Sequence, residues 1–434
     1  MLKDTSGKTN VFLNRNYRLV FFGALVSELG AMLYSFAVSF YILELSGNNA
    51  FLQGLYLALC GVVYVVFTPV GGVLGDRFNK AKIMYICDYV KGGVIALATL
   101  LLVLFQAREA RIAVLFAAGI LGNAVSGIFS PASSALPPHI VEQDQLQQAN
   151  AYFSVKNSLQ TILGVVLAGI LYAALPVPIL FAIVAACYVL SGVSEMFIRY
   201  AHDAAKERLT IRLALADMRE GLDYLKGQKA IMMLMAAILF INFFFAPVSG
   251  NFIPYFVKTD VAGAPSYLFD SFLTPELWSA VVTMLIGVSS LVGAVILSAR
   301  KQEEKCGPRM TLWLCVLAAV MLLLTAGYWL LVDRGVSLNI YLLLFCLGTL
   351  LVGFLLPLIN IPFNTVLMRI IAKDKLSKVS SIINVLSQGL TPIAAVLAGV
   401  ILQSFGSTFL LLICSVGFAA TALFLLFKKE AREI

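Results

Sequence analysis

Charged side chains are scarce in this sequence. Asp, Glu, Lys and Arg make up 12% of its 434 residues, whereas a soluble domain carries roughly a quarter. Apolar residues make up 60%, and they form continuous blocks of the length that crosses a bilayer as a helix, about 20 residues. Backbone groups inside lipid need internal hydrogen-bond partners, and the blocks do not alternate with polar residues. The sequence therefore predicts membrane-spanning helices rather than a barrel.

Metal-ligand clusters and cysteine pairs are also missing. The only two histidines, His139 and His202, lie far apart in the sequence. The seven cysteines form no CxxC pair and none falls in a predicted external loop, so we expect neither a zinc site nor a disulfide. Gly7-Lys8-Thr9 lacks the first glycine of a phosphate-binding loop. We expect no enzyme activity, no cofactor and no metal.

The apolar blocks predict an all-α membrane protein with twelve transmembrane helices. Residues preceding the first block are polar, and because that block is too long for a signal-peptide core, we expect it to be retained. The approximate cores are Leu19–Ile42, Leu52–Leu74, Ile83–Phe105, Ile112–Phe129, Ala149–Leu175, Val177–Ile198, Ala230–Val257, Leu277–Ala299, Met310–Val332, Leu338–Ile361, Val379–Phe405 and Thr408–Phe427.

The distribution of Lys and Arg predicts the orientation, because basic residues are retained on the cytoplasmic side. With the N-terminus inside, 25 basic residues fall on cytoplasmic segments and 4 on external ones. We therefore expect both termini to be cytoplasmic and the net charge of +8 to reflect topology. The charge is spread over many short loops, which argues against a nucleic-acid partner.

The longest polar stretch divides the spans six and six. It predicts an N-terminal six-helix bundle at 1–198, a cytoplasmic linker with amphipathic helix at 199–229 and a C-terminal six-helix bundle at 230–434. The halves also resemble each other, since a shift of 230 residues places Val166–Gly169 on the identical Val396–Gly399. Parallel six-helix repeats are typical of carriers that rock two bundles about a central site.

The loop between the second and third spans carries a recognisable motif. It contains Gly72, Leu74, Asp76-Arg77, Lys80 and Lys82, and it resembles the signature loop of the major facilitator superfamily. The resemblance implies a conformational latch formed by Gly72, Asp76, Arg77, Lys80 and Lys82. Glycines at this helix end allow a close approach, and an aspartate favours the N-terminus of a helix from the opposite half. Asn79 replaces the usual glycine, and Asn tolerates a left-handed turn.

Further stretches are similar to the macrolide-efflux branch, the third drug:proton antiporter group. They are Asp88–Lys91, Phe129–Ala132, Leu146–Asn150 and Glu220–Leu225. Siderophore exporters and lysophospholipid transporters carry similar motifs. Asn123 occupies a position where proton-coupled drug exporters often carry an arginine, so the arginine's role in proton transfer cannot be assigned to this chain.

Ionisable residues within spans are candidates for function. Glu28 lies near the middle of the first span, and it is a candidate for proton coupling or for attracting a substrate charge; the alternative is a structural carboxyl. Asp88 and Lys91 are three residues apart and are expected to form a structural ion pair. We expect Lys156 to extend towards the cytoplasmic interface and Glu195 to lie at that interface.

In the major facilitator fold, spans one, four, seven and ten face the central cavity. The resemblance therefore implies cavity candidates among their polar and aromatic residues, although each Asn could instead form an interhelical hydrogen bond. These candidates are Tyr34, Asn123, Phe129, Asn242, Asn251, Asn360 and Asn364. Pro247 and Pro254 around Gly250 predict an interruption of the seventh span.

The sequence thus favours a secondary active exporter of amphipathic small molecules, monomeric and multi-pass, in a bacterial plasma membrane. Its expected partners are the small substrate, membrane lipid and, as the coupling ion, protons. The main alternative is a lipid or lysophospholipid transporter of the same fold, followed by a solute importer and then a receptor that does not transport.

Overall fold

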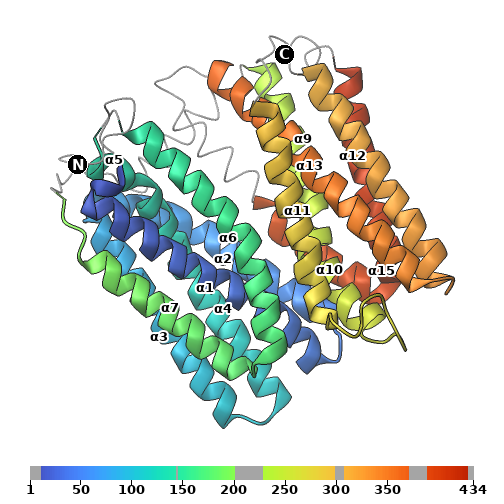
Figure 1. Cartoon of the computed structure of the whole chain (residues 1–434), viewed down its shortest axis with the longest axis horizontal. Coiled ribbons are helices and arrows are strands. Elements are labelled where there is room, and N and C mark those ends of the chain that lie inside the picture. Colours follow the sequence, from blue (N-terminus) through green and yellow to red (C-terminus); the bar gives the residue numbers. More distant parts are fainter. Residues whose placement is uncertain (1–10, 143–144, 201–227, 299–306, 371–388, 429–434) are drawn as a thin grey trace. The chain divides into compact units, whose positions relative to one another are not determined.

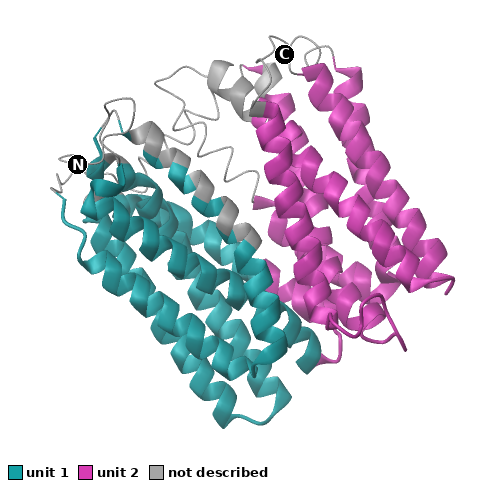
Figure 2. Ribbon diagram, in the orientation of Figure 1, with its two compact units in different colours: residues 1–45, 59–214 teal, residues 46–58, 215–434 magenta. Residues whose placement is uncertain are grey.

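The structure is a computed structural model that describes residues 11–142, 145–200, 228–298, 307–370 and 389–428. Within these ranges the chain is helical and contains no strand, which confirms the predicted all-α class. Ten of the helices are long and apolar enough to cross a membrane. The chain divides into two compact units: unit 1 comprises residues 1–45 and 59–214, and unit 2 comprises residues 46–58 and 215–434 (Figure 2).

Unit 1 contains the first set of long helices (Figure 1). Helix α3 packs against both α7 and α4, and Asn79 caps its start by accepting the backbone N–H of Lys82 at 3.1 Å. In chain order the elements are the 3-10 turn η1 (Val11–Leu13), α1 (Arg15–Ser46), most of α2 (Ala50–Arg77), α3 (Lys80–Leu104), α4 (Arg108–Ala135), α5 (Pro137–Ile140), α6 (Leu146–Ala174) and α7 (Val177–Met196).

Unit 2 contains the second set. Its main contacts are those of α11 with α13 and of α15 with α12 and α9. Its elements are α9 (Lys229–Pro247), the π-helical turn η2 (Val248–Phe252), α10 (Ile253–Phe256), the π-helical turn η3 (Val257–Val261), α11 (Pro275–Ser298), α12 (Gly307–Tyr328), the π-helical turn η4 (Trp329–Asp333), α13 (Leu338–Ile370) and α15 (Thr391–Phe427).

Glycines set the closest helix crossings in both units. A Cβ on Gly71 of α2 would lie 2.6 Å from Ile128 Cα, and one on Gly127 of α4 would lie 2.7 Å from the Tyr64 carbonyl oxygen. This confirms at Gly71 the close approach that we expected from the glycines at the end of α2. At Gly75, where we expected the same, a Cβ would lie 3.7 Å from Ala132 Cα, an ordinary contact. In unit 2, a Cβ on Gly293 of α11 would lie 2.6 Å from the Phe354 carbonyl oxygen of α13. Small residues let helix backbones approach in this way within membranes.

Two helices bear on the predicted count of twelve spans. Helix α6 has 29 residues, of which the described apolar part is Leu163–Ala174. Helix α15 has 37 residues and is broken at Gly406, whose φ of 81° lies in a region open to glycine but rarely to other residues. This break falls between the predicted spans ending at Phe405 and beginning at Thr408. The count of twelve stays a prediction, as does the cytoplasmic location of the termini.

The α-helix of the seventh predicted span is interrupted by π-helical turns at the predicted place, although the chain does not leave the helical path. Pro247 removes one backbone donor, and the chain continues through η2, α10 and η3 instead of unwinding. The wider π turns shift the hydrogen-bond register past the two prolines, which is how a helix accommodates such residues without leaving the helical path. Most of the predicted linker at 199–229 lies outside the described residues.

Candidate functional site

A cavity of about 280 Å³ lies within unit 1, enclosed by residues of α1, α2, α3, α4 and α7. Its walls combine several serine hydroxyls with the rings of Tyr64, Phe129 and Tyr188 and with two residues of opposite charge, Glu28 and Lys91. Small-molecule sites are concave, largely apolar pockets of roughly 300–1,000 Å³ with a few placed polar groups. This cavity has that character and the lower end of that size.

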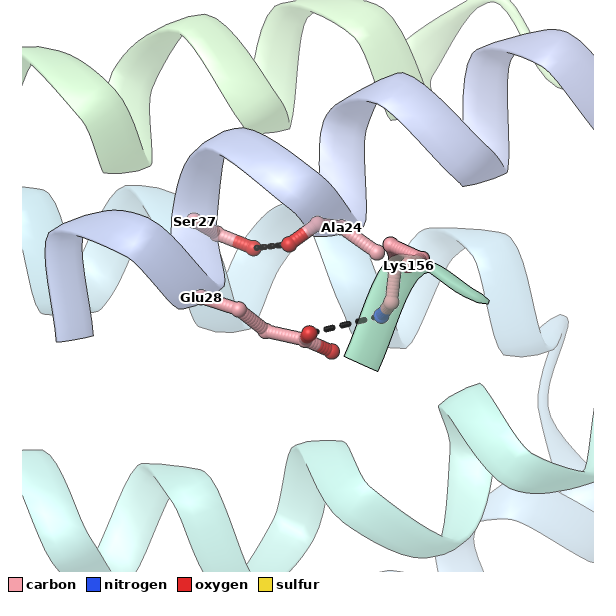
Figure 3. Close-up of polar contacts among 4 residues, drawn as sticks. All are labelled: Ala24, Ser27, Glu28 and Lys156. Carbon is pink, nitrogen blue, oxygen red and sulfur yellow. Dashed lines mark hydrogen bonds and ion pairs between the residues drawn. The ribbon is translucent and has the colours of Figure 1, made fainter. Parts of the chain in front are cut away.

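Glu28 forms an ion pair across the cavity wall (Figure 3). The Lys156 ammonium of α6 donates to Glu28 Oε2 of α1 at 2.6 Å. The Lys156 side chain is 4% exposed and the Glu28 side chain 33% exposed, so Glu28 is the more accessible member of the pair. We had expected Lys156 to extend to the cytoplasmic interface, and the ion pair with Glu28 shows that it does not. The partly exposed carboxylate is the group of this pair that a ligand can reach.

Lys91 is held by aromatic rings. Its Nζ lies 4.6 Å from the centroid of the Phe129 ring and 5.3 Å from that of Tyr188, distances at which a cation is attracted to the ring face. The direct ion pair expected with Asp88 is not formed: Asp88 is buried and neither of its carboxylate oxygens bonds to Lys91. Asp88 and Lys91 are close because they are three residues apart on α3. The Lys91 ammonium nevertheless lies against the two rings, which face the cavity.

Glu195 lies in the last turn of α7 and is fully buried within unit 1; its position at the membrane interface stays a prediction. Gly23 of α1 covers it, since a Cβ there would lie 3.4 Å from Glu195 Cγ and 3.5 Å from Ser191 Oγ. Neither Glu195 carboxylate oxygen has a hydrogen-bond partner. These distances are ordinary contacts, so α1 covers the two polar residues at normal packing distance.

The signature loop follows the end of α2. Asp76 and Arg77 are the last helical residues of α2, and nothing lies within 4 Å of a Cβ built on Gly72. Asn79 has φ −58° and ψ 116° and caps α3, so it does not use the left-handed conformation that Asn tolerates. Lys80 is buried and its N–H donates to the Tyr200 hydroxyl at 2.8 Å, whereas Lys82 is exposed. Burial raises the pKa of the Tyr200 phenol.

The other predicted cavity residues of unit 1 have different positions. Phe129 lines the cavity, but neither Tyr34 nor Asn123 is among its lining residues. The Tyr34 ring packs 5.1 Å from that of Phe181. The Asn123 amide donates to the Gly119 carbonyl one helical turn earlier, at 2.9 Å.

In unit 2, Asn251 is fully buried and its amide donates to the Ala395 carbonyl of α15 at 3.3 Å. This is the interhelical hydrogen bond that we gave as the alternative to a substrate contact. Asn242 is half-buried and Asn360 is exposed, while the side chain of Asn364 lies outside the described residues. The roles of all these residues as substrate contacts stay predictions.

Sequence reasoning named both Glu28 and Lys156 but did not pair them. The signal was present, since each is a lone charge well inside a predicted span and the two signs are opposite. The burial of Glu195 carried no comparable signal, because it comes from contact with α1, which is distant in the sequence.

Comparison with known proteins places the chain in one family. The model of the Major Facilitator Superfamily matches residues 20–395. The uncharacterized MFS-type transporter YkuC of Bacillus subtilis (strain 168) is 23% identical over 74% of this chain and 72% of its own length. Macrolide efflux protein A of Streptococcus pyogenes is 23% identical over 55% of this chain and 58% of its own length.

Solved structures show the same fold. The nucleoside transporter NupG has a TM-score of 0.74 at 12% identity, covering 96% of this chain and 100% of that one. A D-xylose-proton symporter has a TM-score of 0.72 at 12% identity, covering 98% and 100%. Together with ten helices that could each cross a bilayer, these matches establish a multi-pass membrane protein. The chain belongs to the major facilitator superfamily and is one of its transporters.

Proposed function

We propose that this transporter is a secondary active exporter of amphipathic small molecules and that it binds them in the unit 1 cavity. The observation that carries the proposal is the composition of that cavity. Phe129, Tyr64 and Tyr188 offer flat apolar surface, and Glu28 and Lys91 offer one charge of each sign. An amphipathic molecule with a charged or polar group can satisfy both kinds of wall at once.

Export is favoured over import by the relatives. The sequence is similar to macrolide efflux proteins over about half of its length. A proton gradient is the proposed driving force, and Glu28 is the proposed residue that takes up a proton or attracts the charge of the substrate. The residues Gly72, Asp76, Arg77, Lys80 and Lys82 are proposed to act as a latch between alternating-access states, with both termini cytoplasmic in a bacterial plasma membrane.

A lipid or lysophospholipid substrate is the second candidate, and the same cavity favours it. Opposite charges at Glu28 and Lys91 suit a zwitterionic headgroup as well as they suit a drug. Import is the third candidate, since a structural neighbour of the same fold is a D-xylose-proton symporter. The three candidates differ in ligand class or in the sign of flux, so one set of assays separates them.

The test combines binding with transport. Purified protein is screened by thermal shift against erythromycin, tetraphenylphosphonium and a lysophospholipid, because a bound ligand raises the apparent stability by mass action. The ligand that binds is then followed in proteoliposomes with an imposed pH gradient. We expect a drug-like cation or macrolide to bind. In the proteoliposomes it should move against its gradient, away from the compartment that the cytoplasmic face of the protein contacts. Binding by the lysophospholipid alone, or uphill movement in the opposite direction, would replace the proposal with the corresponding alternative.

The proposed orientation has its own test. Single cysteines at Ser266 and Gly335, in a background without native cysteines, should react with a membrane-impermeant thiol reagent in intact cells. A cysteine at Asn79 should react only after lysis. Labelling of Asn79 from outside would reverse the topology and remove the basis of the latch.

A further inference from the structure

Two acidic residues next to the cavity are enclosed more completely than Glu28. Asp88 of α3 and Glu195 of α7 are both fully buried, and all four of their carboxylate oxygens lack a hydrogen-bond partner. Ionised carboxylates accept several hydrogen bonds when they are buried in proteins, since an uncompensated buried charge is strongly unfavourable. Two such groups side by side therefore require an explanation beyond helix packing.

A third buried polar group points to the same place. Ser191 lies one helical turn before Glu195 on α7, is fully buried, and its hydroxyl also lacks a hydrogen-bond partner. Ser191 is close enough to act on the Asp88 carboxylate, and Gly23 of α1 closes over both α7 residues. Five side-chain oxygens from two helices are thus buried together, and the contact between Ser191 and Asp88 is the one polar interaction among them that can offset part of the charge.

The charges of Asp88, Glu195 and Lys91 do not balance when both acids are ionised. Asp88 and Glu195 interact with each other and share one cation, Lys91, while Glu28 is already matched by Lys156. With both acids ionised, the group would carry one excess negative charge in a low-dielectric interior. The other ionisable groups that face it are Cys87 of α3, Glu28 of α1 and Tyr188 of α7, and among the described residues these add no second cation.

We propose that Asp88 and Glu195 form a proton-binding site that holds one proton at neutral pH. An O–H bond forms on one carboxylate oxygen when the proton enters, and the same bond breaks when the proton leaves to water. A sodium ion fits less well, because it would need a full shell of oxygen ligands while the Lys91 ammonium already occupies the neighbourhood. No group of three or more His, Cys, Asp or Glu side chains suitable for a metal occurs in the described ranges.

Lys91 connects this site to the cavity. Its ammonium lines the cavity against the Phe129 and Tyr188 rings and, among the described residues, is also the single cation that faces the two acids. Loss of the proton leaves two carboxylates that attract Lys91 away from the rings, which alters the charge and the shape of the cavity wall. A ligand in the cavity and a proton on the acid pair therefore bias each other through one side chain, as linkage between two sites requires.

This site deepens the proposed coupling and assigns it to residues other than Glu28. Its role in transport rests on the proposed function, but proton binding itself does not. The proton can be measured without any substrate, as the carbonyl stretching band of a protonated carboxyl group in infrared difference spectra. A protein that shows the band but exports nothing would refute the proposed export alone, and a protein that exports without the band would refute this inference alone.

The experiment compares infrared spectra of the purified protein with those of Asp88→Asn and Glu195→Gln at neutral pH. We expect the wild type to show the band of one buried carboxylic acid and each variant to lose it, since one remaining acid is neutralised by Lys91. Glu276→Gln is the matched control, because Glu276 of unit 2 is ion-paired with Lys258 at 2.8 Å; it should keep the band. Retention of the band in both acid variants would overturn the proposal.

A third variant keeps the test informative if an acid variant folds poorly. Lys91→Met removes the cation, so both acids should become protonated and the band should double in intensity. An unchanged band in Lys91→Met would contradict the charge balance. Disappearance of the wild-type band on adding sodium at constant pH would show that a metal ion displaces the proton, and it would equally overturn the assignment.

Discussion

The interiors of the two units share a packing scheme but differ in polarity. In both, glycines allow two long helices to cross closely: α2 and α4 at Gly71 and Gly127, and α11 and α13 at Gly293 and Gly353. Yet every buried charged residue in the described part of the chain belongs to unit 1, and the buried polar residues of unit 2 are neutral. The charged members are Lys80, Asp88, Lys91, Lys156 and Glu195.

Unit 2 instead has an aromatic interior. The rings of Phe252, Phe256, Tyr328, Tyr341 and Phe345 pack with centroid separations between 5.2 and 6.0 Å. A cavity lined by described residues of unit 2 has a volume of about 10 Å³ and an entirely apolar lining, and it is too small for a substrate. Buried charge is thus concentrated in unit 1 and aromatic packing in unit 2, which is why the proposed function places ligand binding in unit 1.

The largest expected effect comes from breaking the ion pair of unit 1. Lys156→Met leaves the Glu28 carboxylate unpaired beside the cavity, and removing one partner of a buried pair costs about 3–5 kcal/mol. Glu28 is one-third exposed, which lowers the expected loss of stability to roughly 1–3 kcal/mol. We also expect transport to be abolished, as measured in proteoliposomes alongside thermal melting.

Lys258→Met is the matched variant in unit 2. It breaks the Lys258–Glu276 pair, whose side chains are 14% and 16% exposed. We expect a similar loss of stability but near-normal transport by the protein that remains folded. Equal loss of transport in the two variants would remove the functional difference between the units.

Replacing glycine by alanine at the close helix crossings should lower the stability of both units by a similar amount. A Cβ on Gly127 would meet the Tyr64 carbonyl oxygen at 2.7 Å, and one on Gly353 would meet Ile286 Cα at 2.8 Å. Gly127→Ala and Gly353→Ala should each destabilise the protein by about 1–3 kcal/mol, the usual cost of overpacking. Gly72→Ala, at a position with open space, is the control and should melt like the wild type. Tolerance of alanine at either crossing would show that the backbones can separate there.

A smaller effect is expected at the cavity wall. Phe129→Ala removes one ring from Lys91 and one apolar surface from the ligand, and a cation–π contact contributes about 0.5–2 kcal/mol. We expect KM for the transported ligand to rise up to roughly thirtyfold with little loss of stability. Phe345→Ala in unit 2 should show the reverse, with marked destabilisation and an unchanged KM. A KM that does not move in Phe129→Ala would place the ligand elsewhere.

The smallest effect concerns the signature loop. Asp76→Asn removes a charge that would favour an opposing helix N-terminus, an interaction of about 0.3–1 kcal/mol. We expect normal insertion, a change of at most about fivefold in the ratio of inward- to outward-open states, and reduced transport. Double electron–electron resonance between spin labels on the two units measures the populations. Wild-type distance distributions and transport would leave Asp76 with no role as a latch.

Much of the fold followed from one-dimensional patterns, because a lipid environment demands continuous apolar helices. The close approach at Gly71 and the break between Phe405 and Thr408 were also readable, since each depends on local residue types. The site was less readable. Lys156 pairs with Glu28 from 128 residues away, and no periodicity encodes which spans are neighbours.

The local rule for charged neighbours was misleading at Asp88 and Lys91. Spacing of three residues favours an ion pair on an isolated helix, but the Phe129 ring from α4 and the Tyr188 ring from α7 compete for the ammonium. Asn79 has a role that its tolerance of left-handed turns did not indicate. Its side chain caps α3, a preference that Asn has independently of any left-handed turn.

The most direct test of the account is counterflow in proteoliposomes with the bound probe from the thermal-shift screen. Only a carrier exchanges labelled for unlabelled ligand, and the account assigns that exchange to unit 1. We predict exchange by the wild type and by Lys258→Met, and loss of exchange in Lys156→Met at matched amounts of folded protein. Exchange that survives in Lys156→Met and disappears in Lys258→Met would contradict the central claim that unit 1 contains the substrate site.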